Sequence, residues 1–133
     1  MNANISLIVQ VPSGPAVTAA WTVTADAFDQ VSAACPASTA GTATKLLLTP
    51  TAAAEQVIVL TASGYATAAD PTKLTYKFFD GTTGGTARNF TEPIALVGST
   101  VTAAASGSYA AVEIVNKLAA PVTVNCFLLR TAV

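Results

Sequence analysis

The stretch that decides the fold is Tyr109–Arg130, which reads Tyr-Ala-Ala-Val-Glu-Ile-Val-Asn-Lys-Leu-Ala-Ala-Pro-Val-Thr-Val-Asn-Cys-Phe-Leu-Leu-Arg. Two runs rich in β-branched residues flank a short linker that ends at Pro121. In the second run apolar residues recur at every other position from Val122 to Leu128, which is the period of a strand. We therefore predict a hairpin, with Pro121 beginning its second strand and Asn116 entering the turn.

The composition is that of one domain without a membrane span. The chain has 133 residues and a mass of 13.3 kDa, enough to bury a sizeable core. Hydrophobic residues make up 52% of it, but Thr, Ser, Gly or Pro interrupts every apolar run before the ~18 residues that a bilayer requires. We expect a single domain over residues 1–133, with no integral membrane segment and no membrane partner.

Charge is scarce along the chain. Charged residues make up 10% of the sequence, against about 25% in ordinary soluble domains. The net charge is -1, and the six basic residues are scattered and form no stripe that could follow a phosphate backbone. We therefore expect no nucleic-acid partner. A neutral exterior of short side chains loses little entropy when another protein covers it.

The N-terminus and the cysteines indicate where the protein is made. Residues 1–5 have neither a positively charged start nor a long apolar segment, so we expect no signal peptide and synthesis in a cytoplasm. A reducing compartment disfavours disulfides. We therefore predict that Cys35 and Cys126 are buried free thiols rather than a disulfide.

Alternation of apolar and polar residues predicts strands along most of the chain. Residues 5–11 and 17–24 are expected to form a hairpin around Pro12–Pro15, with Trp21 in the core. The segment 25–35 is the exception. Its apolar residues are spaced for one helical face and Pro36 follows them, so a short helix or turn is expected there.

The rest of the chain completes an all-β domain. Further strands are expected at 45–49, 55–62, 73–80, 94–97, 100–103 and in the last two runs. Residues 55–62 are apolar on both faces, which predicts a central or covered strand. With about eight strands and at most one short helix, the sequence predicts a single antiparallel β-sandwich or jelly roll, with residues 1–11 as a possible N-terminal arm or edge strand.

Catalytic chemistry has little support in the sequence. The chain contains no histidine, which excludes Ser-His and Cys-His pairs and the commonest metal ligand. Asp26 and Asp29 are best explained as solvated acids at a helix start, and Asp80–Gly85 as a hairpin turn. Tyr65, Phe90 and Tyr109 could form a sugar-binding platform, although core packing is the favoured interpretation. We expect no enzyme, no catalytic residue, no metal and no cofactor.

The chain resembles the head decoration, or cement, proteins of tailed bacteriophages. The resemblance lies in a histidine-free, Thr- and Ala-rich β domain of this length that ends in Tyr-Ala-Ala-Val-Glu-Ile-Val-Asn (109–116) and Pro-Val-Thr-Val-Asn-Cys (121–126). It implies a virion protein, often a homotrimer, that sits on the exterior of the capsid and clamps neighbouring major capsid subunits. It assigns no role to an individual residue.

The residues themselves offer one candidate contact. Ile5, Leu7, Ile8 and Val9 form an apolar arm that could add an edge strand to a neighbour, or pair within its own domain. Two other functional classes remain open: a carbohydrate-binding or adhesin module, and a self-assembling tail-tube, fibre or coat subunit. The former is expected to expose aromatic residues, whereas the latter is expected to polymerise alone.

Overall fold

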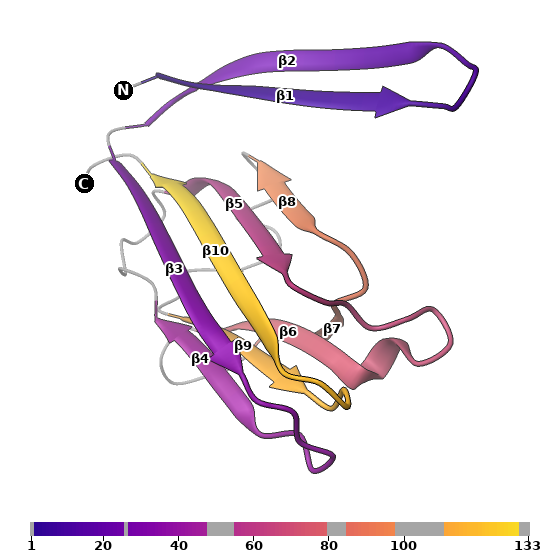
Figure 1. The fold of residues 1–133 in the computed structure, drawn as a ribbon. Coiled ribbons are helices and arrows are strands. Elements are labelled where there is room, and N and C mark those ends of the chain that lie inside the picture. Colours follow the sequence, from indigo (N-terminus) through magenta and orange to yellow (C-terminus); the bar gives the residue numbers. More distant parts are fainter. Residues whose placement is uncertain (1, 26, 48–54, 80–84, 98–110, 131–133) are drawn as a thin grey trace.

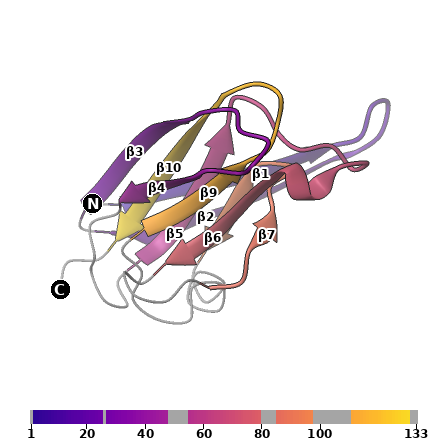
Figure 2. The ribbon, with the colours of Figure 1, turned by 90° about the horizontal axis from the view of Figure 1, so that it is seen from below.

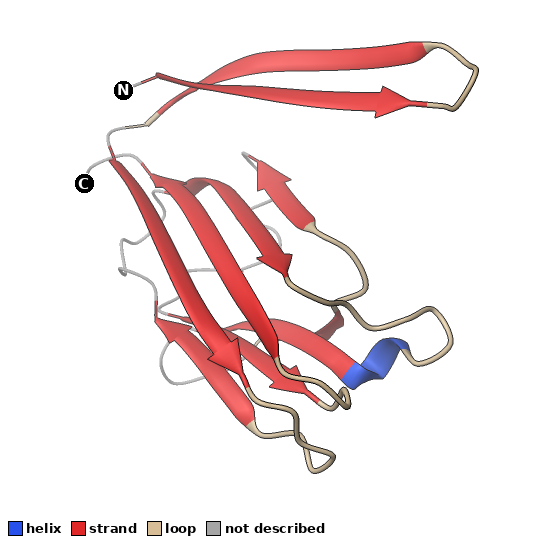
Figure 3. Ribbon diagram, in the orientation of Figure 1, coloured by secondary structure: helices blue, strands red, loops and turns tan. Residues whose placement is uncertain are grey.

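The computed structural model describes residues 2–25, 27–47, 55–79, 85–97 and 111–130. These residues form an all-β, antiparallel structure whose one helical element is the short 3-10 turn η1 (Pro71–Lys73) (Figure 3). The first two strands, β1 (Asn2–Gln10) and β2 (Ala16–Thr24), pair only with each other. The others form two four-stranded sheets that face each other (Figure 1).

The two sheets are defined by their spatial strand order. Sheet I consists of β3 (Ala27–Cys35), β10 (Val122–Arg130), β5 (Glu55–Ala62) and β8 (Ile94–Val97). Sheet II consists of β4 (Ala43–Leu47), β9 (Ala111–Asn116), β6 (Leu74–Phe79) and β7 (Arg88–Asn89). Within the sandwich the pairing is nested, since β3 pairs with β10, β4 with β9, β5 with β8 and β6 with β7.

The core lies between the two sheets and is lined by alternate residues of each strand. Phe90 is fully buried and meets the rings of Tyr65 and Tyr76 edge to face, at centroid distances of 5.3 and 5.4 Å. Edge-to-face contacts of this kind are favourable beyond the area they bury. The other large core side chains are Leu46, Ile58, Leu60, Leu74, Phe78, Val112, Ile114, Val122, Val124 and Leu128.

The predicted fold class is confirmed, and several strands lie where alternation placed them. β5 matches the expected 55–62 and lies between β10 and β8, with Val57 buried on one face and Ile58 on the other. The inward set from Val122 to Leu128 is also as predicted. The possible strand at 100–103 lies outside the described residues.

The predicted hairpin at 109–130 is wrong, because β9 lies in sheet II and β10 in sheet I. Asn116 holds the linker between them. Its side-chain Nδ2 donates to the Ala120 carbonyl at 3.1 Å, and its Oδ1 accepts from the Leu118 amide at 2.9 Å. Nδ2 also donates to the Cys35 carbonyl at 3.1 Å, at the end of β3. Asn116 therefore fixes an arch between the sheets rather than a two-strand turn.

The predicted helix at 25–35 is also wrong, because these residues form the edge strand β3. Side chains of the strand alternate between exposed and partly or fully buried from Phe28 to Cys35. β3 pairs with β10 from Ala27↔Arg130 to Cys35↔Val122. Since β10 offers this side of its backbone ladder to β3, sheet hydrogen bonds outweigh a local preference for helix.

Both cysteines are free and buried, as predicted. Burial raises the pKa of the Cys35 thiol, an effect that a hydrogen bond with Thr44 partly offsets. Burial alone raises the pKa of the Cys126 thiol from 9.0 to about 12. Neither thiol is therefore available as a nucleophile at neutral pH.

The Cys126 pKa leads to a pH-dependent stability. Between pH 9 and about 12 the thiol ionises in the unfolded chain but stays protonated in the folded one. The contribution of the protonated Cys126 thiol to the free energy of unfolding is therefore fully present below pH 9. Above pH 9 this contribution falls by about 1.4 kcal/mol per pH unit. Denaturant titrations at pH 8 to 11 are expected to give a shallower decline for Cys126→Ala than for the wild type. Parallel declines would contradict this.

Candidate interaction surface

The N-terminal hairpin is amphipathic along its whole length. The tight turn between its strands has Ser13 at φ 61°, and the Gly14 amide donates to the Val11 carbonyl at 2.9 Å. Pairing runs in register from Asn2↔Thr24 to Gln10↔Ala16. One face therefore carries apolar residues and the other mostly polar ones. The described apolar side chains on the first face are Ala3, Ile5, Leu7, Val9, Val17, Ala19 and Val23.

The base of the hairpin packs on the outer face of sheet I. Ala3, Ile5 and Val23 contact a small cluster whose buried members are Ala25, Val57 and Leu129. This contact explains why β5 is apolar on both faces, since one face lines the core and the other meets the hairpin. The hairpin lies across one end of sheet I (Figure 1).

The distal half of the hairpin is uncovered. Leu7, Val9 and Val17 continue the same apolar face but are 56%, 53% and 64% exposed. Val11, beside the turn, is 55% exposed. The tip extends past the strands of the sandwich in both views (Figures 1 and 2). The apolar face thus begins on the protein's own sheet and ends in solvent.

The structure divides the predicted arm residues into two groups. Leu7 and Val9 are exposed on the apolar face, and Ile8 is 64% exposed on the opposite, polar face. Ile5 packs at the base instead. The arm also does not consist of residues 1–11 alone, since β1 pairs with β2.

Sequence reasoning missed Val17. It alternates with polar residues as a core residue would, so periodicity gave no signal that its side chain is exposed. Trp21, predicted in the core, has a side chain outside the described part.

A second exposed apolar group lies on the outer face of sheet I. The Phe28 ring is 58% exposed and stacks on the Phe127 ring at a centroid distance of 6.2 Å. Phe28 pairs with Leu129, which belongs to the cluster under the hairpin. Sequence reasoning missed this ring because it had assigned Phe28 to a helix.

Several ionisable groups of the described residues pair across neighbouring strands. Arg130 Nε donates to Asp29 Oδ2 at 2.7 Å across β10 and β3. On sheet II, Glu113 lies 3.1 Å from the Lys77 ammonium and 4.0 Å from that of Lys45. The predicted solvated role of Asp29 at a helix start is wrong, and Asp26 lies outside the described residues. No group of metal-binding side chains was found in the described ranges.

Two further sequence candidates are described only in part. Phe90 is fully buried, and the Tyr65 hydroxyl accepts a hydrogen bond from the Ala62 amide at 2.9 Å, so core packing is confirmed for these rings. Tyr109, the third member of the possible sugar platform, lies outside the described part of the chain. So do residues 80–84 of the Gly-rich segment, while the Gly85 amide donates to the Phe78 carbonyl at 2.7 Å.

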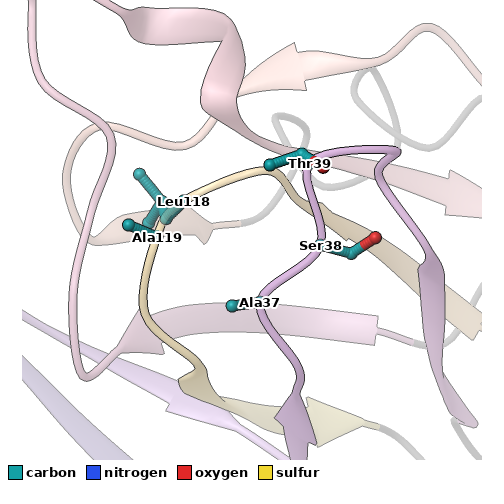
Figure 4. Close-up of a pocket in the computed structure, with 5 residues that line it drawn as sticks. All are labelled: Ala37, Ser38, Thr39, Leu118 and Ala119. Atoms are coloured by element: carbon teal, nitrogen blue, oxygen red, sulfur yellow. The ribbon is translucent and has the colours of Figure 1, made fainter.

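A shallow pocket of about 340 Å³ lies between the β3–β4 and β9–β10 connections (Figure 4). Its lining consists of small and apolar residues with two hydroxyls. None of these side chains is charged, and the hydroxyls are their only hydrogen-bonding groups. The lining residues are Ala37, Ser38, Thr39, Leu118 and Ala119.

Comparisons of this chain with protein-family models, curated proteins and solved structures found no match. In the described residues no helix has the length and apolar character needed to cross a bilayer.

Proposed function

We propose that this chain is a structural virion protein without catalytic activity. It decorates the exterior of a bacteriophage capsid and stabilises it by binding neighbouring major capsid subunits, as a homotrimer. The observation that carries this proposal is the uncovered apolar half of the hairpin, with Leu7, Val9 and Val17 each more than half exposed. Contiguous exposed apolar surface on a soluble domain marks a site that another macromolecule covers.

The nested strand pairing supports a role in a shell. Pairing of the first strand of the sandwich with the last, and of each following pair inward, is what results when one long hairpin is rolled into two sheets. We propose that the sandwich is a jelly roll, an architecture that viral capsid domains use and that lectin domains share. A fold alone does not define function. The exposed part of the N-terminal hairpin therefore has to distinguish a capsid role from a lectin role.

The N-terminal hairpin is suited to binding through many weak contacts. The hairpin, residues 2–24, contains no charged residue, so its contacts depend on apolar area and backbone edges rather than on ion pairs. One such contact is small. Many copies on one shell add their contacts, and the shell is stabilised because all of them must break before neighbouring subunits separate.

The proposal is tested on particles from the organism that produces the chain. Virus particles are purified on a density gradient, and the chain is quantified by mass spectrometry. We expect it at a fixed ratio to the major capsid subunit, and we expect particles made without its gene to release DNA at a lower temperature. Absence of the chain from purified particles would contradict the proposal.

A self-assembling coat subunit is a second candidate. It is favoured by the presence, on one chain, of both an exposed apolar arm and the exposed Phe28 ring. Electron microscopy of the purified chain separates the two functions. A coat or tube subunit forms shells or filaments alone, whereas a decoration protein remains a small discrete oligomer.

A further inference from the structure

We propose that the distal half of the hairpin docks on the outer face of sheet I of a second copy of this chain, beside the stacked Phe28 and Phe127 rings. This docking rests on the proposed function and extends it, because it names one partner of the N-terminal hairpin. It also assigns a role to the Phe28 ring, which is 58% exposed.

The first support is that this docking already exists within one chain. The hairpin base, through Ile5 and Val23, packs on the outer face of sheet I at Val57 and Leu129. The distal half presents the same apolar face, with Leu7 two residues further along β1. The distal half of the hairpin extends beyond sheet I of its own chain and therefore does not cover it (Figure 1). A second copy supplies the same kind of surface.

The second support is that the receiving face is uncharged and partly open. Phe28 is exposed, Phe127 beside it is partly buried, and Gln30 pairs with Phe127 across the sheet. Of the described side chains on this part of the outer face, none is charged. Docking an uncharged arm here therefore leaves no charge unpaired in the contact.

The contact area decides how the copies must be arranged. The distal half is about 17 Å long and about 10 Å wide at ordinary strand spacing, so one face-on contact removes roughly 350 Å² from water, counting both partners. Specific interfaces need about 1,000 Å². One arm is therefore not enough. In a closed trimer each copy gives one arm and receives one, so removing a copy breaks two contacts of about 700 Å² in total, in the range of weak interfaces that many copies on one shell reinforce.

Disulfide trapping between two differently tagged chains tests the docking. One chain carries Val9→Cys on the apolar face of the arm, and the other carries Gln30→Cys next to the rings. Both positions are exposed. The native thiols do not compete, because Cys35 and Cys126 are buried. The chains are mixed at about equal concentration under mild oxidation, and the mixed disulfide dimer is quantified.

Two matched pairs serve as controls. Ile8→Cys with Gln30→Cys places the thiol on the opposite face of the arm, one residue away, where the native side chain is 64% exposed against 53% at Val9. Val9→Cys with Thr39→Cys places the receiving thiol in the β3–β4 connection, at the other end of β3. We expect at least tenfold more mixed dimer from Val9→Cys with Gln30→Cys than from either control. We also expect a severalfold loss when the receiving chain also carries Phe28→Thr.

The outcomes that would overturn the inference differ from those that would overturn the proposed function. Equal yields from all three pairs, or Val9→Cys chains that trap mainly one another, would refute docking on sheet I. An undiminished yield with Phe28→Thr would refute the role of the ring. In each of these cases, presence of the chain on purified capsids would leave the proposed function standing. If Val9→Cys with Gln30→Cys gives the specific disulfide but the chain is absent from purified capsids, the docking between copies would stand and the proposed function would not.

Discussion

Replacing Asn116 with alanine is expected to lower the free energy of unfolding by about 3 kcal/mol. The Asn116 side chain is fully buried. The two hydrogens of its Nδ2 are shared among the carbonyls of Cys35, Pro36 and Ala120 at 3.1, 3.3 and 3.1 Å, and its Oδ1 accepts from the Leu118 amide at 2.9 Å. Alanine would leave several of these backbone groups without a partner, and each buried unpaired group destabilises by about 1–3 kcal/mol.

Urea denaturation followed by circular dichroism measures this effect. Asn125→Ala is the matched control, because Asn125 lies on the outer face of β10, pairs across to Ser32, and is only partly buried. We expect a loss below about 1 kcal/mol for the control. Equal losses for the two variants would show that Asn116 does not hold the arch between β9 and β10.

Deletion of the hairpin, residues 1–24, is expected to have two separable effects. It uncovers Val57 and Leu129 on the outer face of sheet I, which should lower the free energy of unfolding by about 3 kcal/mol. It should also abolish self-association. The sandwich should nevertheless fold, because none of the hairpin side chains that the structure describes belongs to the core between the sheets.

Thermal unfolding and light scattering measure the two effects. Deletion of residues 1–11 alone should be more damaging to solubility, because β2 would lose its only described strand partner and present an unpaired edge. A hairpin deletion with unchanged melting temperature and unchanged oligomeric mass would contradict both roles of the hairpin.

Alternation in the sequence predicted most strands but not how they pair. The alternation of β10 is as compatible with a hairpin to β9 as with a central position between β3 and β5. The placement of β9 and β10 in different sheets depends on Asn116, whose partners include Cys35 and Pro36, some 80 residues away in the sequence. β3 was missed for a similar reason, since its strand character comes from β10 rather than from its own spacing.

Exposure along the hairpin could not be read from the sequence either. Val17 and Val23 have the same alternation and the same residue type, yet Val23 packs on sheet I while Val17 is 64% exposed. The difference arises because sheet I ends under the middle of the hairpin. The length of the hairpin relative to the sheet is a property of the tertiary structure, and periodicity carries no information about it.

The central claim is that another protein chain covers the distal half of the hairpin. Hydroxyl-radical footprinting tests it most directly, by comparing the oligomer with the dilute chain. We predict that labelling of Leu7, Val9 and Val17 falls severalfold in the oligomer while that of Ile8, on the opposite face, stays unchanged. Equal labelling of the four residues in both states would contradict the account.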